Sequence, residues 1–414
     1  MKILQISDIH WTKRRHWEED YPGMKSKFHD DIKEYIEVGN QIDYVFICGD
    51  VVYKGIKEEY DKALKYIDDL CGIIGCTRKE VFVVPGNHDL SRDFAAHQQR
   101  EMMNAALAFE PSNNSFLDNV TLKSEELRKT QFDAFKDYNE FAKEFLCHEK
   151  VMDKCINGGD DAITDNDELF YHTQLSKKVG DFTVSVRGVN TALNCDAWDW
   201  NEKYKDGHLQ ILPQRAYVLE KEEKQEVRII MGHHPTSFLT SRTKVEEYLN
   251  CHYHIQLFGH VHIQNIQGDN YVRVLSGALN PPPDKKEPGK YKPIYNIVEL
   301  SPLDETHIKV IGESQIWDRN KFIRYNAGCF VKEIEIELNK NKWESPKMNM
   351  HDNIDVRGVK FAFLQRGDRV SFFDKIDEVH FTQIAGKSEY DQCLDFLDAV
   401  EKAGKLSQLN ELMK

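Results

Sequence analysis

The sequence contains a series of short runs of β-branched and aliphatic residues, each of which stops at small or polar residues. Six runs, at residues 3–6, 44–48, 81–84, 184–189, 227–231 and 255–258, precede the segments SDIH, GD, PGNHD, NT, GHHP and GHVH. Largely apolar runs of this kind suit strands buried on both faces of a sheet in an α/β fold. Because ligands of such sheets gather where the strands end, the polar segments predict a site at the carboxyl ends of the strands.

Apolar residues at helical spacing lie in 28–36 and 63–70, and we interpret both segments as crossover helices between strands. Residues 91–165 predict a helical insertion that could cap a site. Its aromatic residues, at steps of three to five, are Phe132, Phe135, Tyr138, Phe141 and Phe145. A packed helix face is the favoured interpretation of this stripe, and stacking on a nucleobase is the alternative.

Further strands are expected at residues 271–275, 295–300 and 308–311, where they would close a second sheet. After about residue 320 the pattern changes to short strands, at 330–338 and 359–364, and a helical tail over 388–414 that breaks at Gly404. We therefore predict a catalytic domain over 1–318 and a C-terminal accessory region over 319–414.

The charge balance limits the possible partners. The chain has 414 residues and a formal net charge of -14, which argues against broad nucleic-acid binding, because such binding depends on Lys and Arg neutralising phosphates. The net charge does not exclude a local basic groove. One candidate for such a groove is the cluster Lys13-Arg14-Arg15 between Trp11 and Trp17.

Cysteine usage bears on the compartment. The nine cysteines are scattered and form no C-x-x-C pair, which is typical of reduced thiols. The N-terminal MKILQISDIH lacks the apolar core of a secretory signal, and no run reaches the roughly 18 apolar residues of a membrane span. A cytoplasmic protein without membrane contact is therefore expected.

His260 and His262 are one residue apart at the end of an extended run. Side chains at i and i+2 of an extended chain project to the same side, so both imidazoles can reach one site. Gly259 lets the backbone turn or approach a ligand closely at this point. A pair of surface histidines is the alternative, since the chain has 17 histidines.

The ends of the other runs carry the same kinds of group. Five segments contain imidazole, carboxylate or amide side chains: Asp8-x-His10, Gly49-Asp50, Gly86-Asn87-His88-Asp89, Gly232-His233-His234-Pro235 and Gly259-His260-x-His262. Such a donor set without thiolates suits divalent ions such as Mn, Fe, Zn or Ni.

The ordered set D-x-H, G-D, G-N-H-D, G-H-H-P and G-H-x-H resembles the calcineurin-like metallophosphoesterases over residues 1 to about 315. The segments GDVVY and VFVVPGNHDLSR are most similar to the bacterial cyclic-nucleotide-phosphodiesterase-like branch. The resemblance implies an α/β fold, a four-layer αββα sandwich, to which this chain would add the helical insertion and a small C-terminal α+β appendage.

The resemblance also implies two metal ions. Asp8, His10 and His262 would bind one ion, Asn87, His233 and His260 would bind the other, and Asp50 would bridge both. His233 is chosen over His234 because the family places its histidine two residues before the proline. Manganese is the ion expected to support activity in vitro.

Two divalent ions about 3.5 to 4 Å apart can clamp a phosphoryl group, lower the pKa of a bridging water and stabilise an in-line displacement. By resemblance, His88 would hydrogen-bond the phosphate or protonate the leaving oxygen, as a group that titrates near neutrality. Asp89 would orient that imidazole. Alternatively, Asn87 and Asp89 cap a helix, and His234 is a core histidine.

The favoured function is a metal-dependent phosphodiesterase or phosphatase acting on a small or nucleotide-like phosphoester. The first alternative is a DNA or RNA nuclease of the same superfamily, in which Lys13-Arg14-Arg15 and the aromatic residues of the insertion bind single strands. The second alternative is an effector whose C-terminal region binds a protein partner, because the closing DAVEKAGKLSQLNELMK weakly resembles small helical adaptor domains.

Overall fold

The computed structural model describes residues 1–12, 21, 23–92, 133–145, 171–195, 212, 214–217, 225–239, 242–281 and 290–336, with scattered positions between 363 and 413. The chain divides into two compact units, Met1–Trp343 and Glu344–Lys414. Within the described ranges, the structure has no helix with the length and apolar character needed to span a bilayer.

A seven-stranded mixed sheet contains the N-terminal strands of the first unit. Its order is β12-β11-β10-β1-β2-β3, and β13 pairs with β11 beside this path. The strands are β1 (Lys2–Ile6), β2 (Tyr44–Cys48), β3 (Val81–Val84), β10 (Ile294–Pro302), β11 (His307–Asp318), β12 (Lys321–Arg324) and β13 (Phe330–Glu335). β1, β2 and β3 run parallel, as their largely apolar sequences predict.

A six-stranded sheet of order β4-β5-β6-β7-β9-β8 forms the other half of the unit. Its strands are β4 (Tyr171–Val179), β5 (Phe182–Val189), β6 (Glu226–Met231), β7 (Ile255–Phe258), β8 (Asn265–Gln267) and β9 (Val272–Leu275). β5, β6, β7 and β9 are parallel, and β4 and β8 pair antiparallel at the two edges. The carboxyl ends of the four parallel strands therefore lie along one edge of the sheet.

The predicted membership of the second sheet was wrong for two strands. β9 joins that sheet, but β10 pairs antiparallel with β1 of the first sheet, with Lys2 opposite Glu299, and β11 pairs with β10. The alternation of apolar residues identifies a strand, whereas its neighbour is chosen by long-range backbone hydrogen bonds that the local pattern does not encode.

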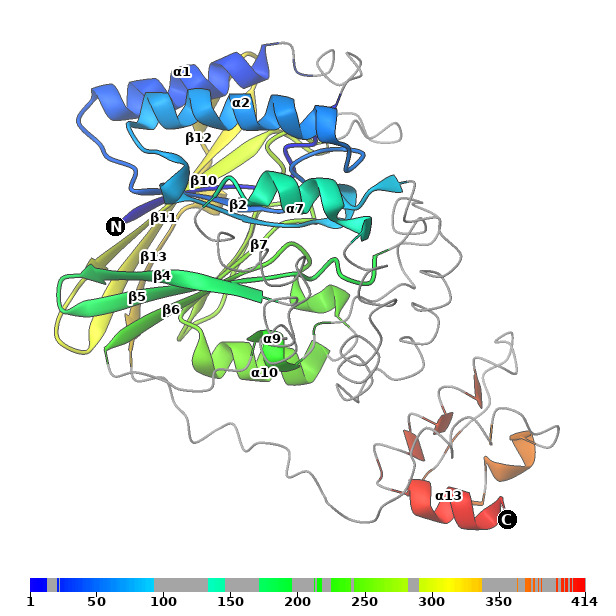
Figure 1. The fold of residues 1–414 in the computed structure, drawn as a ribbon. Helices are drawn as coiled ribbons and strands as arrows, with labels where there is room; N and C mark the ends of the chain where they lie inside the picture. The colour runs from blue at the N-terminus through cyan, green and yellow to red at the C-terminus, as the bar shows by residue number, and fades with distance from the viewer. Residues whose placement is uncertain are drawn as a thin grey trace, which may run out of the picture. The chain divides into compact units, whose positions relative to one another are not determined.

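The two sheets pack face to face between helices. α1 (Met24–Glu37) and α2 (Lys57–Ile74) cover the seven-stranded sheet, and α10 (Arg242–His252) and α9 (Gln214–Tyr217) lie beyond the six-stranded sheet (Figure 1). One hydrophobic core joins Phe28 of α1 to strands of both sheets, and a second core packs Leu249 of α10 against Ile230 of β6. This packing brings the polar ends of strands from both sheets together.

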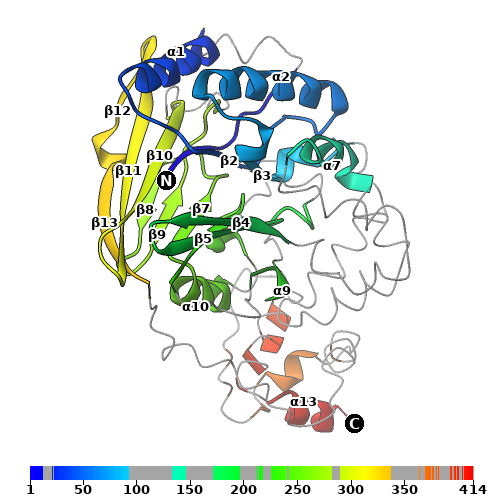
Figure 2. The same ribbon diagram turned by 60° about the vertical axis from the view of Figure 1, so that its left-hand side comes forward.

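Of the predicted insertion, the structure describes residues 91–92 and 133–145; the other residues, including Phe132, lie outside the described ranges. α7 (Lys136–Ala142) packs beside α2 (Figures 1 and 2). The aromatic side chains that it buries with its flanks are Phe135, Tyr138, Phe141 and Phe145. In this segment the stripe is a packed helix face, as the favoured interpretation has it.

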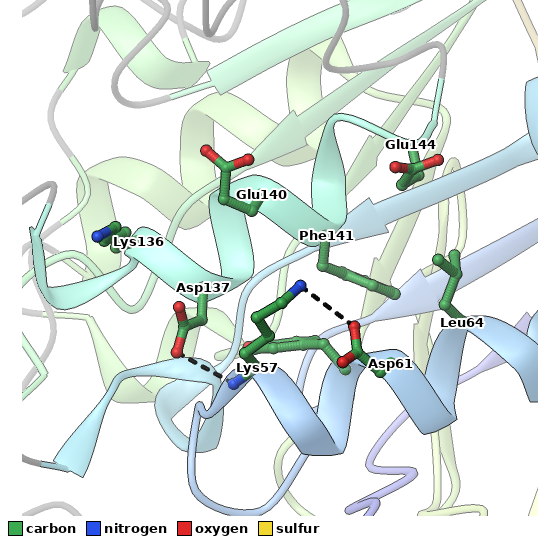
Figure 3. A pocket seen from close by; sticks show the side chains of 9 residues that line it. Lys57, Asp61, Leu64, Lys136, Asp137, Glu140, Phe141 and Glu144 are labelled. Carbon is green, nitrogen blue, oxygen red and sulfur yellow. Dashed lines mark hydrogen bonds and ion pairs between the residues drawn. The ribbon is translucent and has the colours of Figure 1, made fainter.

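A pocket of about 380 Å³ lies between α2 and α7 (Figure 3). Lys57 of its wall contacts Asp61 at 3.3 Å and donates its backbone N–H to Asp137 at 3.0 Å. The lining residues are Lys57, Tyr60, Asp61, Leu64, Lys136, Asp137, Glu140, Phe141 and Glu144. This mixed-charge pocket is distinct from the strand ends that carry the polar segments.

β12 and β13 follow residue 318, the predicted domain boundary, and both pair with β11 of the first sheet. The second unit contains α13 (Leu406–Leu412) and its own hydrophobic cluster, which includes Phe363, Phe396 and Leu409. Within the described residues, the short 3-10 helices are η2 (Arg78–Glu80), η3 (Asn87–Asp89), η7 (Thr236–Phe238), η8 (Asn326–Gly328) and η10 (Arg369–Phe372).

Candidate metal centre

All seven predicted metal ligands lie in described segments, directly after β1, β2, β3, β6 and β7. Backbone hydrogen bonds join these strand ends: Asp8 donates its N–H to the Gly49 carbonyl at 3.0 Å, and Gly259 donates to the His233 carbonyl at 2.9 Å. The ends of both sheets therefore supply side chains to one cluster.

The first group of donors consists of Asp8, His10 and His262. Nε2 of His262 lies 3.0 Å from Oδ1 of Asp8, and Nε2 of His10 lies 4.0 Å from the same oxygen. The donor atoms of the three residues lie within 4.8 Å of one another, which is close enough for one ion to contact them all.

The second group consists of Asn87, His233 and His260. Nε2 of His233 lies 3.2 Å from Oδ1 of Asn87 and 3.3 Å from Nδ1 of His260. Nε2 of His233 therefore lies within 3.3 Å of both the Asn87 amide oxygen and an imidazole nitrogen of His260.

Asp50 lies between the two groups. Its Oδ2 is 3.2 Å from Nε2 of His10 in the first group and 3.3 Å from Nε2 of His233 in the second. Its Oδ1 accepts a hydrogen bond from the backbone N–H of His88 at 2.8 Å. One carboxylate thus contacts both groups of donors, which is the position that a bridging ligand needs.

The backbone at these positions is unusual. Seven non-glycine residues in the described ranges have positive φ, and five of them are Asp8 (54°), His10 (48°), Asp50 (52°), His260 (71°) and His262 (56°). Left-handed backbone costs energy for residues with a Cβ and concentrates at functional sites. Its coincidence with the donor residues fits a site built to hold a cation.

Burial and charge in the cluster also suit a cation. Burial alone would raise the pKa of Asp8, but the neighbouring His262 and His233 lower it to about 2. In the same way, burial opposes ionisation of Asp50, and His233 and His88 hold its pKa well below the ordinary value. Buried carboxylates require positive partners, which imidazolium or a metal ion can supply.

Two histidines of the cluster are oriented by backbone carbonyl oxygens. Nδ1 of His10 lies 3.2 Å from the carbonyl oxygen of Asn280, and Nδ1 of His233 lies 2.8 Å from that of Cys48. Because a carbonyl oxygen only accepts, Nδ1 carries the proton and Nε2 remains available for a metal. The sequence does not predict the contacts of Asn280 and Cys48, because every residue has a backbone carbonyl oxygen and its use does not depend on the side chain.

The two adjacent histidines of GHHP have different hydrogen-bond partners. His233 faces Asp50 and Asn87, whereas Nδ1 of His234 lies 3.0 Å from the hydroxyl of Thr191 and Nε2 lies 4.0 Å from Sγ of Cys195. His234 nevertheless lies beside the cluster, since donor atoms of His233, His234 and His260 lie within 4.8 Å of one another. The choice of His233 over His234 as the ligand therefore stays a prediction.

The His88 ring of the GNHD segment is buried against Tyr53. Nδ1 of His88 lies 3.0 Å from the carbonyl oxygen of Tyr53, which therefore orients that ring. Burial lowers the pKa of His88 to about 3. The proton-transfer role of His88 and the orienting role of Asp89 stay predictions.

Asp89 holds the backbone beneath the cluster. Its carboxylate accepts hydrogen bonds from the N–H groups of Gly86, Val51 and Val52 at 2.9 to 3.2 Å, and from the Tyr60 hydroxyl at 3.0 Å. It therefore ties the loop after β2 to the loop after β3, in agreement with the alternative capping role.

Comparison with known proteins identifies the family. The sequence profile described as Calcineurin-like phosphoesterase matches residues 1–264. The chain belongs to this family. The buried Asp and His clusters described above supply the donors for the metal site of such a metallophosphoesterase.

Curated relatives share part of their length with this phosphoesterase. It is 24% identical over 297 residues to the uncharacterized metallophosphoesterase-like protein YydB of Bacillus subtilis, covering 67% of this chain and 53% of YydB. It is 29% identical over 106 residues to the 3',5'-cyclic adenosine monophosphate phosphodiesterase CpdA of Haemophilus influenzae, covering 26% of this chain and 36% of CpdA. The chain thus spans about half of YydB and about a third of CpdA.

Solved structures also align with this phosphoesterase. Vacuolar Protein Sorting 29 from Cryptosporidium parvum is 14% identical with a TM-score of 0.33, and the alignment covers 81% of this chain and 97% of that one. Calcineurin-like phosphoesterase YfkN from Bacillus subtilis is 10% identical with a TM-score of 0.33, and the alignment covers 99% of this chain and 98% of YfkN. Membership of the family rests on the sequence profile and not on these alignments.

Proposed function

We propose that this chain hydrolyses phosphoester bonds at a dinuclear metal centre formed by the clustered strand ends. The observation that carries the proposal is the contact of the Asp50 carboxylate with both donor groups, at 3.2 Å from His10 and 3.3 Å from His233. The proposed ligands are Asp8, His10 and His262 for one ion, Asn87, His233 and His260 for the other, and Asp50 for both. The packing order of helices, two sheets and helices supports the four-layer αββα sandwich of the family.

The donor set favours Mn, Fe, Zn or Ni over a soft ion that prefers thiolates. When bound, two such ions neutralise phosphoryl oxygens and lower the pKa of water. The chain's own contribution is to hold the donors before binding: two carbonyl oxygens fix the rings of His10 and His233 with Nε2 toward the ligand position.

His88 is the residue proposed to exchange a proton with the substrate. Its ring meets His10 edge to face, with centroids 4.9 Å apart, and its backbone contacts Asp50. A bound phosphoester brings negative charge beside this buried ring and thereby favours the imidazolium form. Nε2–H then donates to a phosphoryl or leaving-group oxygen.

The substrate class is proposed to be nucleotide-like, and a cyclic nucleotide is the first natural phosphodiester to test. The support for this is the partial similarity to CpdA, whose name states cyclic adenosine monophosphate as substrate. The basic Lys13-Arg14-Arg15 of the nuclease alternative lies outside the described residues. Among the described aromatic residues of α7 and its flanks, the side chains are buried and do not favour stacking on a nucleobase.

The test is hydrolysis of bis-p-nitrophenyl phosphate and of 3',5'-cyclic adenosine monophosphate by the purified protein with manganese. Asp50→Asn removes a charge that both donor groups contact, and His88→Ala removes the proton donor, so turnover falls about 10²-fold or more in each. His307→Ala, at a partly exposed histidine that begins β11, is the matched control and retains activity. Undiminished turnover in both site variants would refute the proposal.

A further inference from the structure

Tyr53 contacts the His88 imidazole in two ways. Its carbonyl oxygen lies 3.0 Å from Nδ1 of His88, and its phenol ring stacks on the imidazole with centroids 4.9 Å apart and planes 22° apart. A stacked aromatic face restricts the rotation of the imidazole, and the carbonyl oxygen accepts from Nδ1–H. Position and proton placement are therefore set by the same neighbour.

Tyr53 is itself held by other side chains. The buried carboxylate of Glu59 accepts hydrogen bonds from the N–H groups of Tyr53 (3.2 Å) and Lys54 (2.8 Å). The guanidinium carbon of Arg92 lies 4.5 Å from the centroid of the Tyr53 ring, and Nη2 of Arg92 lies 3.3 Å from the Tyr53 carbonyl oxygen. These contacts fix both the backbone and the ring of Tyr53.

The arrangement repeats the device found at two proposed metal ligands. Nδ1 of His10 and of His233 each face a backbone carbonyl oxygen, and in both cases Nε2 points to the donor cluster. At His88 the carbonyl oxygen is supplied by Tyr53, and only this histidine of the three also has a stacked tyrosine ring beneath it. The extra ring constrains a histidine that must keep its direction without a metal bond.

We propose that Tyr53 is a positioning residue that holds the Nδ1–H of His88 on its carbonyl oxygen and so directs Nε2 into the donor cluster. Because a carbonyl oxygen only accepts, Nδ1 is committed to this contact and Nε2 is the nitrogen left to face a substrate. The phenol ring keeps Nε2 directed at the phosphoester. This inference rests on the proposed role of His88 and names a residue through which that role is controlled.

The inference predicts which substrates depend on Tyr53. A leaving group of high pKa, such as an alkoxide, needs a proton as its bond to phosphorus breaks, whereas p-nitrophenolate leaves readily without one. Loss of the Tyr53 ring should therefore impair alkyl phosphoesters more than p-nitrophenyl esters, with kcat reduced and KM little changed.

The kinetic test compares Tyr53→Phe, which keeps a stacking ring, with Tyr53→Leu and Tyr53→Met, which remove it. We expect Tyr53→Phe to stay within about twofold of the wild type and the other two to lose about tenfold or more in kcat with an alkyl leaving group, since misplacement of about 1 Å can cost about 10²-fold. In the His88→Ala background the same substitutions should have no further effect. Equal losses for all leaving groups, or losses that add to that of His88→Ala, would overturn the proposal.

A second readout does not depend on activity. Long-range ¹H–¹⁵N spectra of the ¹⁵N-histidine-labelled protein, assigned with His88→Asn, report which ring nitrogen carries hydrogen. We expect a single Nδ1–H form in the wild type and Tyr53→Phe, because both keep the ring that holds the imidazole against the carbonyl oxygen. Without that ring the imidazole can rotate away from the carbonyl oxygen, so Tyr53→Leu and Tyr53→Met should show a mixture of tautomers. An unchanged Nδ1–H form in the ring-less variants contradicts the positioning role. If the wild type hydrolyses no phosphoester, the proposed function fails, and these spectra still decide the role of Tyr53.

Discussion

Gly259 approaches Ser7 so closely that a Cβ at residue 259 would lie 1.9 Å from Oγ of Ser7. That hydroxyl donates to Oδ2 of Asp8 at 2.5 Å and to the Cys48 carbonyl at 2.9 Å. The end of β7 in one sheet therefore touches the end of β1 in the other, and a side chain at residue 259 would separate the donors that the two sheets supply.

Gly259→Ala should disrupt the metal centre while leaving most of the fold intact. The added Cβ meets Ser7 Oγ and the Cys48 carbonyl, so Asp8 must shift away from His262. We expect metal content measured by elemental analysis to fall and activity to fall with it. Gly72→Ala in α2, where a Cβ has open space, is the control and should stabilise the protein by up to about 1 kcal/mol. Full metal content in Gly259→Ala would contradict this account.

His233→Asn and His234→Asn form a matched pair of adjacent substitutions. His233 contacts Asp50 and Asn87, whereas His234 contacts Thr191 and Cys195. Metal-to-protein ratios of the folded variants should show loss of an ion with His233→Asn and full occupancy with His234→Asn. The reverse result would reassign the ligand within the GHHP segment.

The stability of chelator-treated protein should fall as pH rises from about 6.5 to about 9. Burial lowers the pKa of His233, but Asp50 and Asp8 raise it, from 6.5 to about 9. The folded state then binds more protons than the unfolded state over this window, so the free energy of unfolding decreases with pH. Urea unfolding at a series of pH values measures this slope, which should flatten in His233→Asn. Stability that rises across the window would show that His233 is not protonated there.

Asp89→Ala should destabilise the protein strongly, because it removes the acceptor for buried N–H groups of Gly86, Val51 and Val52. Each buried donor left without a partner costs about 1 to 3 kcal/mol. Tyr60→Phe removes a single hydrogen bond to the same carboxylate and should cost about 1 kcal/mol. Denaturant unfolding of Asp89→Ala tests this structural role of Asp89. If the role of Asp89 were purely catalytic, the denaturant concentration at the midpoint of unfolding would not change.

The local pattern of the sequence determined the strands and the positions of the candidate donors. Short, largely apolar runs predict β1, β2, β3, β5, β6 and β7, and the polar segments that follow them contain the seven proposed ligands, which the structure brings together. This succeeds because burial on both faces requires apolar side chains within a strand, and a site at the strand ends requires polar ones just after it.

Tertiary structure alone decided which atoms meet. The pairing of β10 with β1, the Tyr53 carbonyl oxygen at His88 and the use of Asp89 as a backbone clamp depend on segments far apart in the chain. The left-handed backbone of Asp8, His10 and Asp50 could not be predicted from the sequence, because these positions are not occupied by glycine, the residue that usually indicates positive φ. Backbone carbonyl and N–H groups are the same in every residue, so the sequence specifies side chains with chemistry but not the backbone atoms that orient them.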